Sequence, residues 1–550
     1  MKRFWKRGVS MLAVLALALT TFGASVTSSA FGQEPKPLVV ASLAGSDEVL
    51  SNILYVTEAA SVGDFGRLAA MLAGPYTAPL DKTRPFGVYL TLLGEDDVRA
   101  MSFVPVKDLK MLLMTMEQQI GKPEDLGDGV LKIAADRPQP MFVKESDGWA
   151  FVANRQEHLN DLPKDPVALL DGLDKKYTFA LRVNVCNIPP NLREMAVTQV
   201  RQGFEDRVAQ ELNPQQAQAM RQFGGLLVDS IVQVIEETDH ITLGWQVDKE
   251  AKKTYLDVSF TAVQGTELAK QMKLIKEGKS AFAGFSLPDA AVTFLGHGAS
   301  SKSEVEQSTA LLARLREQAM QGIERDGNLA NDDECQTVKA IVNQLLDIAG
   351  ETVKAAKMDA GATLVLKPGS LAFAGGGFVA DGVKLAETLK KLAEFAAQKD
   401  PNFPGVNFDA ETYEGVTFHT AKIPLRGADS KAREILGDPL ELVIGTAKTS
   451  AYVAFGKDAA GLLKSVLTAS SADRGKQLPP SQLRLALTPI LAFVAATDPK
   501  PEIQAALDAV KQYAGSDTIS VTATPIKNGC TVRLEVHEGV LKAIGGAVKR

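Results

Sequence analysis

The side chains that could bind a transition metal are spread widely along the sequence. The five histidines have no close-spaced partner; they are His158, His240, His297, His419 and His537. Glu538 follows His537, but no second histidine stands four residues after His537, as the helix of a zinc protease would require. We therefore predict no metal ligands and interpret the histidines as surface or strand-end residues.

Two glycine-containing stretches resemble phosphate-binding loops in part. Gly278-Lys279-Ser280 ends as such a loop ends, but Lys273 occupies the place of its first glycine. Gly375-Gly376-Gly377 falls in or beside an expected strand, where glycines mark a bulge or a close backbone crossing. The sequence also lacks the Gly-x-Ser-x-Gly elbow of many hydrolases, so Ser286 and Ser450 have no support as nucleophiles. We predict no cofactor and no catalytic residue.

Acidic residues are concentrated in one loop, and single aspartates also stand before three of the expected strands. The loop Asp326–Glu334 could hold calcium, but its second position is glycine and its fifth is alanine, unlike an EF-hand. We interpret it as the solvated tip of a helical hairpin. Asp239, Asp359 and Asp517 each stand just before an expected strand, where a carboxylate can accept hydrogen bonds from backbone N–H groups. We predict a folding role for these three aspartates.

The three cysteines, Cys186, Cys335 and Cys530, lie far apart in the sequence. Because the number is odd, at least one thiol is unpaired or shared between chains, and their redox state stays open. Cys186 and Cys530 stand in apolar alternating runs and are expected to be buried. Cys335 opens an expected helix and should be the most exposed.

The first thirty residues have the order of a secretory signal peptide. Small residues ending at Ala30 follow the apolar run Met11–Leu19, and the basic residues Lys2, Arg3, Lys6 and Arg7 precede it. We predict cleavage after Ala30, with Gly32 as the alternative. A membrane anchor is the competing interpretation, but the run is short for a span of ~20 residues. No later run is long enough to cross a bilayer, so we expect a secreted or periplasmic protein without a transmembrane segment.

The charge balance argues against nucleic acid as a partner. The full sequence has 60 Lys and Arg residues and 66 Asp and Glu residues, a net charge of −6. The predicted signal peptide carries four basic residues and no acidic one, so its removal leaves a net charge of −10. An acidic chain lacks the positive surface that binds phosphate backbones.

One order of elements recurs four times along the rest of the chain: a strand, a helix or helical hairpin, two strands and a helix. Alternation of period two marks the strands, and apolar spacing of three to four residues marks the helices. The strand pairs are expected at 88–104, 241–262, 362–374 and 519–536, each followed by a helix. A strand is expected before each hairpin, at 38–43, 179–185, 290–295 and 483–487. Long helical hairpins are expected at 191–237 and 303–357.

Three further strands follow the first and third copies, at 129–153 and 415–454. Because the additional strands occur at the same place in the element order of both halves, duplication of a half-protein is favoured over chance similarity. We predict an α+β fold of two similar halves, residues 31–278 and 279–550, with mainly antiparallel sheet covered by amphipathic helices. The repeated unit is β-α(α)-β-β-α.

One sequence motif consists of two short apolar segments separated by a break. The segments are Gly129–Ile133 and Gly148-Trp149-Ala150-Phe151-Val152-Ala153. In this the chain resembles secreted bacterial proteins of uncharacterised role that are built from degenerate tandem α+β repeats. The resemblance implies an exported protein and brings no catalytic residues with it.

Three functional hypotheses follow. The first is an exported, non-catalytic protein that binds or scaffolds envelope proteins in the periplasm or cell envelope, because repeats build extended surfaces. The second is a carrier of an apolar, lipid-like ligand between sheet and helices. Trp149 and Trp245 are expected to pack in the core, but they could contact an apolar or sugar ligand if they lined a concave face. The third is a hydrolase whose site forms only in the folded chain.

Overall fold

The computed structural model describes residues 36–93, 98–133, 140–211, 214–325 and 332–548. The predicted signal peptide, 1–30, and the acidic-loop residues 326–331 lie outside the described residues. Contacts within the chain divide it into two compact units, residues 1–263 (unit 1) and 264–550 (unit 2). Helix α9 (Glu267–Met272) therefore belongs to unit 2, whereas the boundary predicted at residue 278 would place it in the first half.

Unit 1 begins with strand β1 (Val39–Leu43) and a helical hairpin, after which strands and short helices follow. The hairpin and the elements up to the seventh strand are α3 (Ser46–Ala59), α4 (Gly63–Thr77), β2 (Phe86–Leu92), β3 (Val98–Pro105), α5 (Leu109–Ile120), β4 (Glu124–Asp125), β5 (Val130–Ile133), β6 (Met141–Ser146) and β7 (Trp149–Ala153). The elements after them are η1 (Gln156–Leu159), η2 (Pro166–Leu170), α6 (Leu173–Lys176), β8 (Phe179–Val183), η3 (Val185–Asn187), α7 (Pro190–Glu211), α8 (Pro214–Glu237), β9 (Thr238–Asp248) and β10 (Lys253–Ala262).

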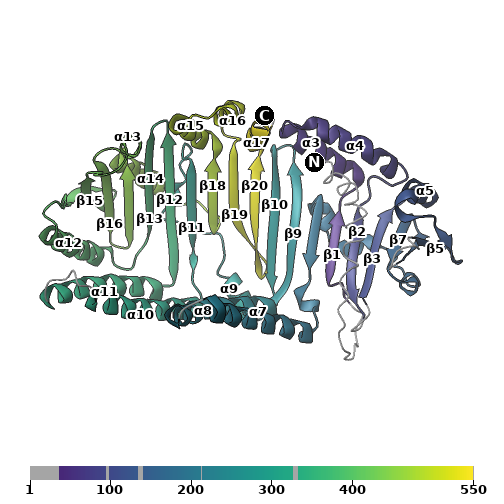
Figure 1. Ribbon diagram of the computed structural model, residues 1–550, viewed down its shortest axis with the longest axis horizontal. Helices are drawn as coiled ribbons and strands as arrows, with labels where there is room; N and C mark the ends of the chain where they lie inside the picture. Colours follow the sequence, from purple (N-terminus) through teal and green to yellow (C-terminus); the bar gives the residue numbers. More distant parts are fainter. Residues whose placement is uncertain (1–35, 94–97, 134–139, 212–213, 326–331, 549–550) are drawn as a thin grey trace. The chain divides into compact units, whose positions relative to one another are not determined.

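The strands of unit 1 lie in the order β4, β5, β6, β7, β3, β2, β1, β8, β9, β10 (Figure 1). Every neighbouring pair in this order is antiparallel. The first strand in sequence is thus central, with β2 and β8 on its two sides.

Unit 2 follows a similar succession of strands and helices after α9. Its elements up to the seventh strand are η4 (Ala283–Phe285), β11 (Val292–Ala299), α10 (Lys302–Glu324), α11 (Asp332–Lys354), β12 (Lys357–Lys367), β13 (Ser370–Phe378), α12 (Gly382–Lys399), β14 (Asn407–Tyr413), β15 (Val416–Ile423), α13 (Ser430–Leu436), β16 (Leu440–Ala447) and β17 (Ser450–Gly456). The last elements are α14 (Ala459–Ala472), β18 (Ser481–Ala486), α15 (Leu487–Thr497), α16 (Pro501–Lys511), β19 (Thr518–Ile526), β20 (Gly529–His537) and α17 (Glu538–Val548).

The strands of unit 2 lie in the order β14, β15, β16, β17, β13, β12, β11, β18, β19, β20, again with antiparallel neighbours. The hairpin α10–α11 lies at one end of these strands and α15–α16 at the other (Figure 1). Both units are therefore α+β with antiparallel sheet, which is the predicted class.

Local sequence signals explain several of these boundaries. Ser301 and Glu304 form a capping box at the start of α10, and the Asp381 side chain accepts a hydrogen bond from the Lys384 N–H at the start of α12. Asp147 and Gly148 both have positive φ, which gives the tight turn between β6 and β7 the twist that a two-residue hairpin needs.

One face of each sheet packs against a closed hydrophobic core. In unit 1 this core surrounds the fully buried Phe103, whose ring meets Trp149 edge to face at 5.3 Å. In unit 2 it surrounds Phe285 and Tyr452, and Leu463 of α14 packs on them without exposed surface. Burial of aromatic and aliphatic surface on this scale is the main source of stability.

The predicted helical hairpins at 191–237 and 303–357 are confirmed as α7–α8 and α10–α11. The sequence did not predict β4, β14 or α13. Among the described helices, none is both long enough and apolar enough to span a bilayer.

Close packing at Gly244 of β9 gives a stability prediction for unit 1. A Cβ at this position would lie 2.5 Å from the ring of Tyr177, which is buried and donates a hydrogen bond of 2.9 Å to the buried Asp257. We expect Gly244→Ala to lower the free energy of unfolding by roughly 1–3 kcal/mol, because the tyrosine must move. Urea unfolding followed by tryptophan fluorescence measures this, since Trp149 and Trp245 both lie in unit 1.

The matched control is Gly203→Ala in α7, where nothing lies within 4 Å of the added Cβ. This change should leave unit 1 unchanged or raise its stability by about 0.5–1 kcal/mol, because alanine favours the helix. Equal effects of the two substitutions would contradict the close packing of Gly244 on Tyr177.

Candidate functional site

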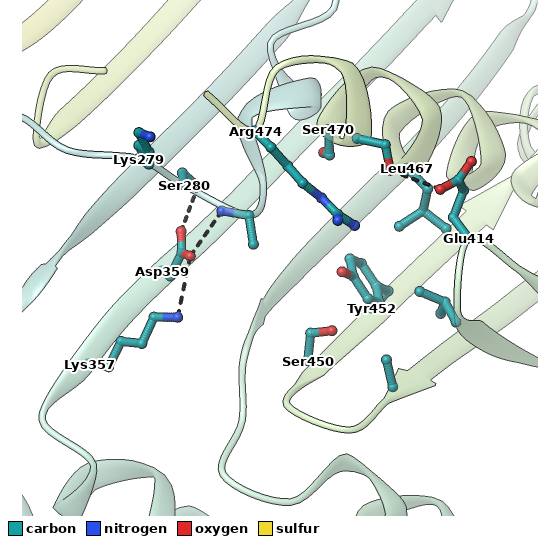
Figure 2. Close-up of a pocket in the computed structure, with 14 residues that line it drawn as sticks. Lys279, Ser280, Lys357, Asp359, Glu414, Ser450, Tyr452, Leu467, Ser470 and Arg474 are labelled. Carbon is teal, nitrogen blue, oxygen red and sulfur yellow. Dashed lines mark hydrogen bonds and ion pairs between the residues drawn. The ribbon is translucent and has the colours of Figure 1, made fainter. Parts of the chain in front are cut away.

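A polar pocket lies within unit 2, at the ends of β12 and β17 and beside α14. Its volume is about 420 Å³. Figure 2 shows Lys279 and Lys357 on one side of Arg474, with Tyr452 and Leu467 on the other side. The pocket combines charged side chains with an apolar floor.

The floor of the pocket is part of the hydrophobic core of unit 2. Val416, Tyr452 and Leu467 line the pocket and are buried. Gly376, on the strand next to Tyr452, could not carry a side chain, because a Cβ there would lie 2.5 Å from the tyrosine ring. The close neighbours of this Cβ are the side chains of Tyr452 and Phe282, so the structure does not show the expected close backbone crossing at Gly376.

A buried carboxylate closes one side of the pocket. Asp359 accepts hydrogen bonds from the Ser280 hydroxyl at 2.5 Å and from the Ala281 N–H at 3.1 Å. Lys357 lies 3.9 Å from the same carboxylate (Figure 2). Ser280 also accepts from the Phe282 N–H, so this hydroxyl holds the segment before η4 in place.

The other serines of the pocket are engaged in a similar way. Ser470 accepts a hydrogen bond from the Gly284 N–H at 3.0 Å, and Ser471 donates to Glu414 at 2.9 Å. These bonds tie α14 to neighbouring loops.

Burial raises the pKa of Tyr452 above its usual value. A hydrogen bond with Ser450 and the positive charge of Arg474 act in the opposite direction, while the charge of Asp359 adds to the rise. The phenol therefore stays protonated at neutral pH and can donate a hydrogen bond.

A second pocket, of about 320 Å³, lies within unit 1 beside α3 and β9. The amide of Asn52 donates to Thr178 at 2.7 Å, and Thr178 donates to Gln246 at 2.5 Å. Gln246 in turn lies 3.5 Å from Glu48. The polar groups here satisfy one another, which is the property of a structural network.

On the face opposite Phe103 and Tyr452, the central strands of each sheet carry apolar rows. In unit 1 a second buried core under α5, against which Phe86 packs, covers the part of this face on β3, β6 and β7. Residues directly opposite in an antiparallel pair share a face, so the register gives cross-strand rows. In unit 1 the rows on β2, β1, β8, β9 and β10 are Phe86-Leu43-Phe179-Trp245-Leu256, Val88-Ala41-Leu181-Leu243-Val258 and Leu90-Val39-Val183-Ile241-Phe260. None of these side chains is charged.

Unit 2 has corresponding rows on β12, β11, β18, β19 and β20. They are Leu364-Val292-Leu485-Ile519-Val536, Ala362-Phe294-Leu483-Val521-Leu534 and Ala360-Gly296-Ser481-Ala523-Val532. We call the rows of each unit its apolar face.

The apolar faces are only partly covered. Ala41 is buried, but the other positions of the rows are half-buried or exposed. Val258 in unit 1 is 43% exposed, and in unit 2 Phe294 is 39% and Val532 42% exposed. Exposed apolar side chains in adjacent rows are typical of a surface that binds a partner or a ligand.

The histidines differ from the prediction in their burial. His158, His297 and His419 are buried, so their interpretation as surface or strand-end residues was wrong. His419 illustrates the reason, because its two ring nitrogens bond the Thr446 hydroxyl at 3.0 Å and the Asp409 N–H at 3.1 Å. Burial lowers the pKa of His419. Among the described residues, no three His, Cys, Asp or Glu side chains come together as a metal site.

The cysteine prediction was also partly wrong. All three thiols are free, and Cys186 is exposed whereas Cys335 and Cys530 are half-buried. The apolar run before Cys186 ends with β8 at Val183, so the cysteine falls in the turn η3 and not in the strand. Cys186 is exposed as a residue, but partial desolvation of its sulfur and the neighbouring Asp239 raise the pKa of the thiol to about 11, which keeps it protonated.

Of the three aspartates, Asp517 precedes its strand and bonds a nearby backbone N–H as predicted, whereas Asp359 lies within β12 and bonds a distant one. Asp517 accepts hydrogen bonds from the N–H groups of Thr488 and Gly515 at 2.7 and 3.1 Å, and Asp359 accepts from the Ala281 N–H. Asp239 instead pairs with the ring of His240 at 3.0 Å.

The sequence patterns did not identify the pocket residues Lys357, Glu414, Tyr452 and Arg474 as a group. These residues come from segments spread over more than a hundred residues, and no local spacing joins them. The apolar faces could have been predicted by aligning the predicted strands side by side, because the row residues are the alternate, apolar positions of each strand.

Comparison of the chain with protein families, with curated proteins and with solved structures found no match. The site is therefore interpreted from its own geometry.

Proposed function

We propose that this chain is an exported, non-catalytic binding protein of the periplasm or cell envelope, and that its apolar faces are the binding surface. The observation that carries the proposal is the set of uncharged cross-strand rows whose side chains remain partly exposed. Export rests on the signal-peptide pattern of residues 1–30.

The hydrogen bonding of the sheet limits how a partner could bind there. Strands β1, β8 and β9 each pair with neighbours on both sides, so their backbone groups cannot accept an incoming strand. A partner must therefore contact the side chains of the rows. Such contact is driven by removal of apolar surface from water.

We also propose that two halves of the chain arose by duplication and that each half contains two copies of the β-αα-β-β-α unit, the first half including α9. Support comes from the order of elements, in which β1, β8, β11 and β18 each precede a helical hairpin, two paired strands and a helix. It also comes from the strand orders, since adding ten to each strand number of unit 1 gives the order in unit 2. A duplicated fold would present the apolar face twice.

The binding-surface proposal predicts a specific loss in Val258→Glu. A carboxylate at this exposed position of the unit 1 apolar face should weaken binding of the neutral dye N-phenyl-1-naphthylamine roughly tenfold, because the dye would have to desolvate the charge. The measurement is a fluorescence titration of the purified protein.

The matched control is Met71→Glu, which changes an equally apolar side chain on helix α4 that is 66% exposed. Dye affinity should not change in this variant. Equal affinities in both variants, or no dye binding by the unaltered protein, would argue against the apolar face as a binding surface.

The second candidate function is a carrier of an apolar, lipid-like ligand. It is favoured by the chemistry of the rows, which contain no charged side chain. The one N–H of the Trp245 side chain donates to the Thr254 hydroxyl at 2.8 Å, so it does not need a partner from a ligand. An acyl chain needs no hydrogen-bond partner, so such a surface suits it. The hydrolase alternative draws no support from the unit 2 pocket, because no histidine that could activate a serine is among the described residues that line it.

Native mass spectrometry of detergent-free protein, followed by organic extraction, tests the carrier. We expect one or more lipid-sized adducts that are depleted in Phe294→Glu, a change to the unit 2 apolar face. Protein that carries no adduct and takes up none from lipid vesicles would exclude the carrier while leaving a protein partner open.

A further inference from the structure

We propose that the unit 2 pocket binds the oxyanion group of a small organic ligand, a carboxylate, phosphate or sulfate, with Arg474 as its main contact. This goes beyond the proposed function, because the pocket lies on the other side of the sheet from the apolar face. Tyr452 lines the pocket, whereas its neighbour Val453 points to the opposite face, since successive strand residues alternate.

The acidic side chains around the pocket have hydrogen-bond partners, whereas two of its basic side chains have none among the described residues. The buried Asp359 carboxylate has two hydrogen bonds and the ammonium of Lys357 nearby, and Glu414 accepts a bond from Ser471. In contrast, Arg474 and Lys279 form no hydrogen bond or ion pair with any residue that the structure describes. Two cations therefore remain available at the pocket, and its carboxylates are already engaged.

The position of Arg474 suits an anion inside the pocket. Figure 2 shows its side chain extending over the pocket toward Tyr452. A guanidinium offers several N–H donors in one plane, which matches the oxygens of a carboxylate, phosphate or sulfate. The hydroxyls of Tyr452 and Ser450 line the same space and can add neutral donors.

The rest of the lining sets the size and character of the ligand. Val416, Ala447 and Leu467 provide an apolar surface beside the cations. A cavity of about 420 Å³ is larger than an inorganic anion needs and lies in the range of small organic ligands. The acidic group would meet Arg474, while the body of the ligand would pack on the apolar floor.

The test is calorimetric titration of the purified protein with sodium phosphate, sodium sulfate and sodium acetate in separate arms. A fourth arm measures sedimentation with phosphatidylglycerol vesicles, which distinguishes a lipid head group from a free anion. We expect at least one arm to show binding that Arg474→Gln weakens about tenfold or more, the size expected for a charge-assisted hydrogen bond. Arg474→Lys should restore part of the affinity, because it returns the charge without the planar donors.

Arg426→Gln is the matched control, since Arg426 is exposed in unit 2 and does not line the pocket. The Arg426→Gln variant should bind the same anion or vesicle with the affinity of the unaltered protein. Arg474 is exposed as well, so the far-ultraviolet circular dichroism of Arg474→Gln should be unchanged. The proposal is overturned if no arm shows binding, or if Arg474→Gln and Arg426→Gln bind alike. Either result leaves the apolar-face proposal untouched, because dye binding does not involve this pocket.

Discussion

The register of antiparallel pairing is the constraint on which the rest of the structure depends. Side chains alternate between the two faces of a strand, so a shift of one residue would move a whole strand's apolar set to the other face. In both units the register keeps this alternation in phase across five neighbouring strands. Leu43, Phe179 and Trp245 thus share one face, while Ser42, Ala180 and Gly244 share the other.

The two faces then acquire different roles. One face is closed by aromatic packing, as where Phe285 and Tyr452 meet under α14, and this closure gives each unit a rigid core. The opposite face keeps an apolar surface whose rows contain no charged residue. Polar chemistry in unit 2 is concentrated at the strand ends, where Asp359 anchors a loop and Arg474 stays available. The proposed apolar and anion-binding sites of unit 2 therefore lie on different faces of its sheet.

The fold was largely predictable from the sequence because its signals are local. Alternation located the strands, and apolar spacing with a proline break located hairpins such as α7–α8. Strand β14 was missed because Asn407–Tyr413 carries too many polar residues to show alternation. Properties set by distant segments were not predictable: the burial of His419 depends on Thr446, and the pocket brings Lys279 together with Arg474.

Quenching of tryptophan fluorescence by a brominated fatty acid tests most directly whether an apolar face accepts a ligand. Trp245 lies in a row of the unit 1 apolar face, whereas Trp149 is buried in the core on the opposite side. In Trp149→Phe, where Trp245 is the remaining tryptophan beyond the predicted signal peptide, we predict saturable quenching. In Trp245→Phe we predict none. Quenching of Trp149 alone, or of neither residue, would contradict binding at this face.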